Sequence, residues 1–158
     1  MLHISKPAER SCQNVPDFCQ CPKYDLKIRP SSSLHQIMFN ETMVAASDRT
    51  MIVHEQELRP VVYFPRMDVE TDLFSMEEKQ TYCPFKGTAS YWTIRTNGYT
   101  ARHAAWSYEA PFEEFQDLGG YFAFYLDKVD CYWRNGMEQP LPCPGRSHNL
   151  TCCESQAA

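Results

Sequence analysis

The stretch "TASYWTIRTNGYTARHAAW", residues 88–106, consists of two runs of β-forming residues on either side of Asn97-Gly98. Runs of this composition with a period of two are typical of strands that bury one face. Asn-Gly readily takes the positive φ angles that a two-residue hairpin turn needs. The sequence therefore predicts a β-hairpin of residues 88–95 and 99–106.

Short runs with the same character precede and follow this hairpin. They cover residues 35–48 with a turn at Asn40-Glu41, residues 49–55, residues 59–65 and residues 121–133. One helix is expected near residues 111–118, because Pro111 suits a first helical turn and Gly119 can end it. Residues 67–80 are polar and are expected to form a loop. This pattern predicts a mainly β fold, a small antiparallel β domain with one short helix.

The length and the ends of the chain indicate a single domain. A chain of 158 residues suits one hydrophobic core. Residues 1–33 and 137–158 show little periodicity, so we interpret them as an irregular N-terminal arm and an irregular C-terminal tail. The domain itself is expected over residues 34–136.

Composition bears on partners and location. The net charge is −5 with both signs interspersed, so nucleic acid is not an expected partner. No apolar run approaches the roughly 20 residues of a membrane helix, and no secretory signal is evident, so we expect a cytoplasmic protein without a membrane span. The eight cysteines are then expected to be free thiols. A zinc site made by Cys19, Cys21, Cys152 and Cys153 is the weaker alternative because their spacings are poor for zinc, and we expect no metal.

Four motifs carry a resemblance to a known family. They are "VVYFPRMDV" (61–69), "TYCPFKGTASYW" (81–92), "AAWSYEAP" (104–111) and "YFAFYLDKVD" (121–130). In this order and spacing they resemble the family called domain of unknown function 427, sometimes labelled nucleotidyltransferase-like, over about residues 35–133. The resemblance implies a β-tent fold, in which two antiparallel sheets meet at an angle. The nucleotidyltransferase label gains no support, since no Gly-rich phosphate loop is present.

The segment Cys83–Gly87 is the first candidate for chemistry. Pro84 fixes its own φ and Gly87 can adopt conformations that other residues cannot, so the segment predicts a rigid turn that presents Lys86. A desolvated lysine can donate to an oxyanion, act as a base or form a Schiff base; the alternative is a solvated loop tip. Cys83 could be a reactive thiol, but a buried cysteine that packs as a small hydrophobe is commoner.

Charged residues at strand ends are the other catalytic candidates. Arg66 and Asp68 are two apart, so in an extended backbone they would point the same way and pair to clamp a polar ligand. The alternative is a structural ion pair that ties down the loop of residues 65–80. Glu55 ends a predicted strand; if it is buried it suits a general base, and if exposed it is an ordinary charge.

Aromatic residues predict the lining of a ligand site, although rings mostly build β cores. With Cys83, the expected ligand-binding residues are Tyr63, Tyr91, Trp92, Trp106 and Tyr108.

These candidates lead to a functional hypothesis in which Lys86, Arg66 and Asp68 meet in one aromatic-lined pocket, joined by Glu55. Such a set supports a cofactor-independent enzyme that isomerises, cyclises or hydrolyses a small carbonyl or ring compound by acid–base chemistry. Two alternatives stay open: a non-catalytic domain that binds a small molecule, and an accessory or structural subunit docked by its arm and tail. A homo-oligomer or larger assembly is compatible with each.

Overall fold

The structure is a computed structural model that describes residues 25–142. Its strands are β1 (Leu26–Ser31), β2 (His35–Phe39), β3 (Thr42–Ser47), β4 (Thr50–Glu55), β5 (Val61–Phe64), β6 (Phe74–Cys83), β7 (Gly87–Thr96), β8 (Tyr99–Tyr108), β9 (Phe122–Phe124), β10 (Cys131–Arg134) and β11 (Met137–Gln139). Its 3₁₀ segments are η2 (Arg66–Asp68), η3 (Thr71–Leu73), η4 (Glu113–Leu118) and η5 (Leu126–Lys128).

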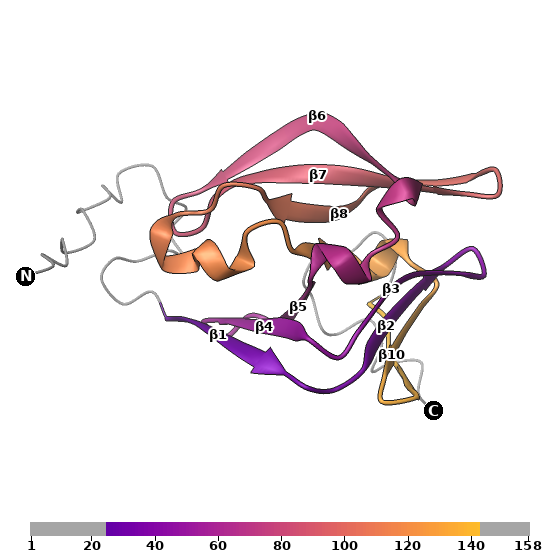
Figure 1. Ribbon diagram of the computed structural model, residues 1–158, viewed down its shortest axis with the longest axis horizontal. Helices are drawn as coiled ribbons and strands as arrows, with labels where there is room; N and C mark the ends of the chain where they lie inside the picture. Colours follow the sequence, from indigo (N-terminus) through magenta and orange to yellow (C-terminus); the bar gives the residue numbers. More distant parts are fainter. Residues whose placement is uncertain (1–24, 143–158) are drawn as a thin grey trace, which may run out of the picture.

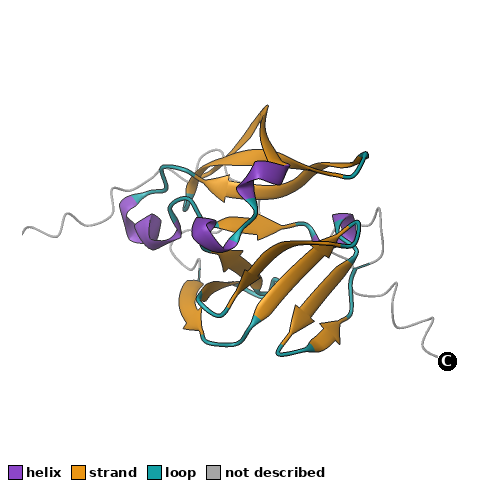
Figure 2. Cartoon of the chain, turned by 45° about the vertical axis from the view of Figure 1, so that its right-hand side comes forward, coloured by secondary structure: helices purple, strands orange, loops and turns teal. Residues whose placement is uncertain are grey.

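The strands form two antiparallel sheets, which confirms the predicted small antiparallel β domain. The larger sheet has seven strands in the order β1-β4-β5-β9-β8-β7-β6, and the smaller has four in the order β11-β10-β2-β3. The larger sheet curls, so that β6, β7 and β8 lie above β1, β4 and β5, with the smaller sheet at one end (Figure 1). Figure 2 shows the short helical segments beside and between these layers.

The predicted turns explain where the strands end. Asn97 and Gly98 have φ of 46° and 84°, which confirms the β7–β8 hairpin. Asn40 and Glu41 connect β2 to β3 in the same way, with φ of 47° and 58°. Asn40, Asn97 and Gly98 readily take positive φ, whereas Glu41 is held there by the turn, and the turns fix the strand register.

The helix and the chain ends differ in part from expectation. The element expected near residues 111–118 is present as η4, a 3₁₀ segment interrupted at Phe115 (φ −123°), and Leu118 is its buried residue. Residues 26–31 were expected to be irregular, yet they form β1, which pairs along its length with β4. Residues 137–139 likewise form β11, and residues 74–80, expected as loop, belong to β6. The rest of the arm and tail, residues 1–24 and 143–158, lies outside the described residues.

The larger sheet has two faces with different contents. One face, here called the core face, packs against the smaller sheet through residues such as Phe64 and Phe122, which meet Ile37 and Val44 from β2 and β3. The opposite face, here called the tyrosine face, gathers a second buried cluster: Val53, Tyr63, Ala89, Tyr91, Tyr108, Leu118 and Ala123. Because side chains alternate along a strand, adjacent residues such as Tyr63 and Phe64 lie on opposite faces.

A buried Lys–Glu pair as the candidate functional site

Lys86 and Glu55 form an ion pair on the tyrosine face. The Nζ of Lys86 lies 2.9 Å from the Oε2 of Glu55, and the two side chains are only 9% and 18% exposed. The Lys86 ammonium also lies over the ring of Tyr108, 5.5 Å from its centroid. A buried pair of opposite charges costs desolvation free energy that a hydrophobic pair would not. The pair is therefore a strong candidate for a functional group rather than a stabilising one.

The curl of the larger sheet brings these two residues together. Glu55 ends β4, and Lys86 lies in the turn between β6 and β7, while β5, β9 and β8 separate β4 from β7 in the sheet. A flat sheet would hold them several strand spacings of about 4.8 Å apart. The β6–β7 turn is held in place because the N–H of Phe112 donates to the Lys86 carbonyl, at 3.0 Å. Gly87 (φ 114°) passes so close to this segment that a Cβ would lie 3.4 Å from the Cα of Pro111.

The surroundings keep Lys86 cationic. Burial acts to lower the pKa of Lys86, but the charges that Tyr63 and Tyr108 acquire when they ionise at high pH, and the Glu55 carboxylate, act to raise it. The net result is a pKa above its ordinary value, and at neutral pH Glu55 is the charged partner. An ammonium donates hydrogen bonds and cannot act as a nucleophile. Of the roles considered for Lys86, the geometry favours donation to an oxyanion over base or Schiff-base chemistry.

Tyrosine hydroxyls next to this pair are neutral donors. Burial raises the pKa of Tyr63, and burial likewise raises the pKa of Tyr108. The Tyr63 hydroxyl accepts a hydrogen bond from the indole N–H of Trp106, at 3.2 Å. A phenol oxygen that accepts one bond keeps its own O–H to donate.

Aromatic rings continue from this point across the tyrosine face. Trp106 lies against Tyr125, with ring centroids 4.6 Å apart, and Tyr125 stacks on Tyr91 at 6.4 Å. Cys83, a free thiol that is partly buried, packs against the same cluster. Tyr125 was not among the expected ligand-binding residues. The signal for it was the alternation in and beside β9, where Tyr121, Ala123 and Tyr125 share a face.

Arg66 and Trp92 lie elsewhere, which corrects the expected convergence. Arg66 pairs with Glu109 at 2.5 Å, and its guanidinium lies over the rings of Trp92 and Phe122, which pack with the core-face cluster. Trp92 follows Tyr91 directly in β7, so its side chain points to the opposite face of the sheet. Lys86 lies over Tyr108 on the tyrosine face, whereas Arg66 lies over Trp92 and Phe122, and a hollow beside Asp68 is lined by neither Lys86 nor Arg66. The structure therefore does not bring the three residues into one pocket.

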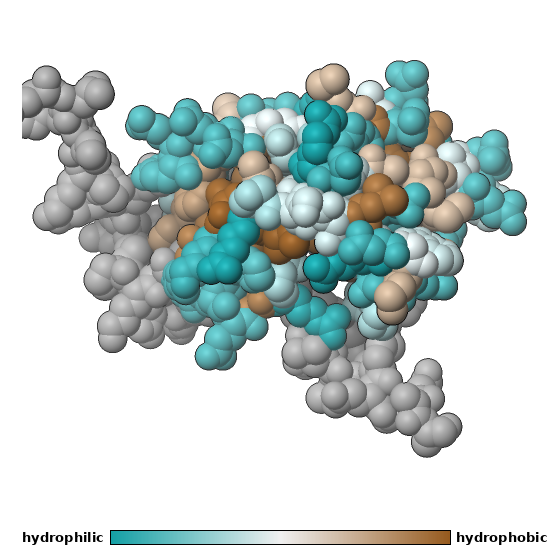
Figure 3. All heavy atoms as spheres, turned by 60° about the horizontal axis from the view of Figure 1, so that its bottom comes forward, coloured by the Kyte–Doolittle hydropathy of each residue, from teal (hydrophilic) through white to brown (hydrophobic). Residues whose placement is uncertain are grey.

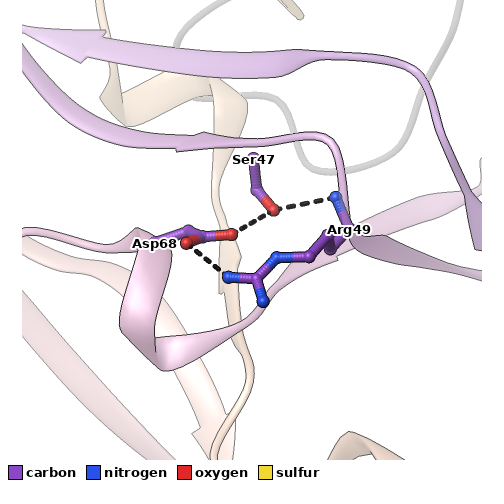
Figure 4. Close-up of polar contacts among 3 residues, drawn as sticks. All are labelled: Ser47, Arg49 and Asp68. Atoms are coloured by element: carbon purple, nitrogen blue, oxygen red, sulfur yellow. Dashed lines mark hydrogen bonds and ion pairs between the residues drawn. The ribbon is translucent and has the colours of Figure 1, made fainter.

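Asp68 is held by residues near the β3–β4 turn. Its carboxylate accepts from the Ser47 hydroxyl at 2.6 Å and from the Arg49 guanidinium at 2.8 Å (Figure 4). The Ser47 hydrogen bond is the main cause that lowers the pKa of Asp68, and Arg49 adds to it against burial. The expected pairing of Asp68 with Arg66 is wrong, because residues 66–68 form the 3₁₀ segment η2 rather than extended backbone.

A hollow of about 180 Å³ lies beside Asp68 on the protein surface. It is lined by Met43, Ala45, Ala46, Met67, Asp68 and Glu70. Within residues 25–142 no group of three or more His, Cys, Asp or Glu side chains could hold a metal ion. The thiols Cys19, Cys21, Cys152 and Cys153 lie outside this range. The same part of the chain contains no helix long and apolar enough to cross a membrane.

The fold and the site together define a class: a small two-sheet antiparallel β domain with a buried Lys–Glu pair on the sheet face that the second sheet leaves free. The chain belongs to the family described as domain of unknown function (DUF427), whose profile it matches over residues 27–135. This match confirms the resemblance and extends it to include β1. A comparison with curated proteins finds no match.

Proposed function

We propose that this protein is a cofactor-independent enzyme that acts on a small carbonyl or ring compound by acid–base chemistry. The observation that carries the proposal is the buried Lys86–Glu55 pair, set among neutral tyrosine hydroxyls and aromatic rings. In such a pair the carboxylate can take a proton from the substrate while the cation stabilises the negative charge that forms. The site that the proposal uses is on the tyrosine face alone.

The roles follow from the chemistry of each group. Glu55 takes a proton from the carbon next to a carbonyl, and the electron pair of that C–H bond moves onto the carbonyl oxygen. Lys86, which has three N–H donors and uses one on Glu55, stabilises the enolate with another. Return of the proton to a different carbon completes an isomerisation. Arg66 and Asp68 have positioning roles in this scheme, because they hold the segment after β5 in place.

Proton exchange at carbon tests this scheme without knowledge of the natural substrate. A panel of enolisable aryl ketones, with phenylacetone as the first probe, is incubated with the protein in D₂O, and loss of the α-proton signals is followed by NMR. We expect exchange faster than the buffer rate with the wild type and at the buffer rate with Glu55→Gln. Glu138→Gln, which neutralises an exposed carboxylate on β11 of the smaller sheet, is the matched control that should exchange like the wild type. Exchange by Glu55→Gln at the wild-type rate would remove Glu55 from the mechanism.

A second candidate is a domain that binds the same class of ligand without turnover. The closed ion pair favours it, since Lys86 and Glu55 already satisfy one another's charge and the contact needs no proton transfer to form. Binding alone raises the melting temperature by mass action. A ketone that raises the melting temperature and shows no exchange would favour this second candidate over the enzyme.

A further inference from the structure

Two turns of the molecule share the sequence Asn-Gly. Asn97-Gly98 joins β7 to β8, and Asn135-Gly136 joins β10 to β11, each as a two-residue loop. The φ angles of the two asparagines are 46° and 49°, and those of the two glycines are 84° and 77°. Both asparagines are exposed. The two turns are therefore matched in sequence, in backbone φ and in access to water.

Asn-Gly is the dipeptide in which an asparagine most readily loses its side-chain amide. The glycine nitrogen gives its proton to a base in the solvent and attacks the asparagine Cγ. A C–N bond forms, the bond from Cγ to the side-chain nitrogen breaks, and that nitrogen takes up a proton and leaves as ammonia. Water then opens the cyclic imide at either carbonyl, which gives aspartate or isoaspartate. Glycine offers no side chain to obstruct the attack, and a Cβ at Gly98 or Gly136 would meet nothing within 4 Å.

The side chain of Asn135 is held by the connection between β1 and β2. Its Oδ1 accepts a hydrogen bond from the N–H of Leu34 at 2.8 Å, and its Nδ2 donates to the Ser33 hydroxyl at 3.3 Å. The backbone N–H of Asn135 also donates to the Leu34 carbonyl, at 2.8 Å. Ring closure requires the Asn135 Cγ to turn toward the Gly136 nitrogen, so the two side-chain hydrogen bonds must break first. Ser33 and Leu34 are here called the Asn135 clamp.

The side chain of Asn97 has no equivalent restraint. Within residues 25–142 its amide makes no hydrogen bond. The nearest side-chain contact with this turn is made by Asn40, whose Nδ2 donates to the Thr96 carbonyl at 3.0 Å. That bond holds the backbone before the turn and leaves the Asn97 amide free to rotate. The Asn97 Cγ can therefore reach the Gly98 nitrogen without the loss of a side-chain hydrogen bond.

We propose that Asn97 is a hydrolytic modification site of the folded protein, converted by water to aspartate or isoaspartate, and that the Asn135 clamp protects Asn135 from the same reaction. The inference does not depend on the proposed function, because Asn97 follows the end of β7 that is opposite to Lys86. The aspartate product fits the same turn, since Asp-Gly also takes positive φ. The isoaspartate product adds one main-chain carbon to a two-residue loop that sets the β7–β8 register.

Peptide mapping by mass spectrometry measures the reaction at both turns in one sample. The full chain is incubated at pH 8 and 37 °C in buffer and, in parallel, in urea that unfolds it, and the converted fraction of each asparagine is followed with time. In the folded protein we expect Asn97 to convert about fivefold faster than Asn135, as a net hydrogen-bond contribution of about 1 kcal/mol implies. In urea the two rates should become equal, because the dipeptides are identical and the Asn135 clamp is lost.

A serine variant tests whether the clamp causes the difference. Ser33→Ala removes one of the two hydrogen bonds on the Asn135 amide, so conversion of Asn135 should rise about twofold, as a net loss of about 0.5 kcal/mol implies, while conversion of Asn97 stays the same. Ser32→Ala is the matched control, because Ser32 is an exposed neighbour in the same connection, and it should leave both rates unchanged.

Several outcomes would overturn the inference. Equal conversion at the two turns of the folded protein, or faster conversion at Asn135, would remove the distinction between them. A preference for Asn97 that persists in urea would assign it to the neighbouring sequence. A folded chain in which Asn97 stays intact while the unfolded chain converts would show that the turn itself prevents ring closure. An Asn135 rate that Ser33→Ala does not change would remove the clamp as the cause.

Discussion

The two faces of the seven-stranded sheet are built from the same strands and do different things. The core face buries aliphatic residues and phenylalanines against a second sheet. The tyrosine face buries tyrosines, a lysine and a glutamate. Figure 3 shows apolar surface interrupted and bordered by hydrophilic side chains on one side of the molecule. The difference teaches that the core face stabilises the fold by burying apolar side chains, whereas the tyrosine face also buries polar and charged groups that a packed core does not require.

Truncation on the core face should have the largest effect on stability. Phe64 is 1% exposed and packs edge-on against Phe124, with centroids 5.4 Å apart. We expect Phe64→Ala to lower the free energy of unfolding by about 3–5 kcal/mol through lost contacts and a cavity. Tyr63→Phe, one residue away on the tyrosine face, should cost only about 1 kcal/mol because it removes a hydroxyl and one hydrogen bond. Urea denaturation compares the two, and equal losses would contradict the division between the faces.

The second-largest loss of stability is expected when the ion pair is broken, and its size should depend on whether a charged partner is left behind. Lys86→Met leaves Glu55 buried without its cation, so we expect a loss of about 3–5 kcal/mol. Lys86→Met combined with Glu55→Met replaces both charges by apolar groups and should restore the stability to near the wild-type value. A double variant as unstable as the single would show that the pair itself stabilises the fold, which would weaken the case for a functional role.

A smaller effect is expected from pH at the junction of the two sheets. His35, 1% exposed, contacts the hydroxyls of Tyr132 at 2.7 Å and Ser31 at 3.2 Å. Burial lowers the pKa of His35, and the charge of Arg134 lowers it further. Between the folded pKa and the unfolded value of about 6.5, only the unfolded state binds the proton. Stability is therefore present above pH 6.5 and decreases as the pH falls below it.

Melting curves between pH 7.5 and 5 measure this effect. We expect the melting temperature of the wild type to fall by a few degrees, at about 2–4 °C for each kcal/mol. His35→Gln keeps hydrogen-bonding capacity without a titrating group and should show a flatter profile over the same range. Parallel profiles for the two proteins would place the pH dependence in other groups.

Much of the fold could be predicted because it depends on local signals. Alternation, the Asn97-Gly98 turn and the Asn40-Glu41 turn located β2, β3, β7 and β8. The strand β1 escaped prediction because it contains Pro30 and is half exposed, so its sequence lacks a clear buried face. Backbone pairing with β4 holds these residues in a strand, although their own sequence does not indicate one.

The sequence by itself determined which residues carry chemistry and which turn presents Lys86. Only the tertiary structure decided their partners: Lys86 meets a residue 31 positions away, and Arg66 meets one 43 positions away instead of Asp68. The physical reason is that strand alternation, a local property, assigns each side chain to a face, whereas the curl of a sheet depends on all of its strands together and decides which distant ends meet.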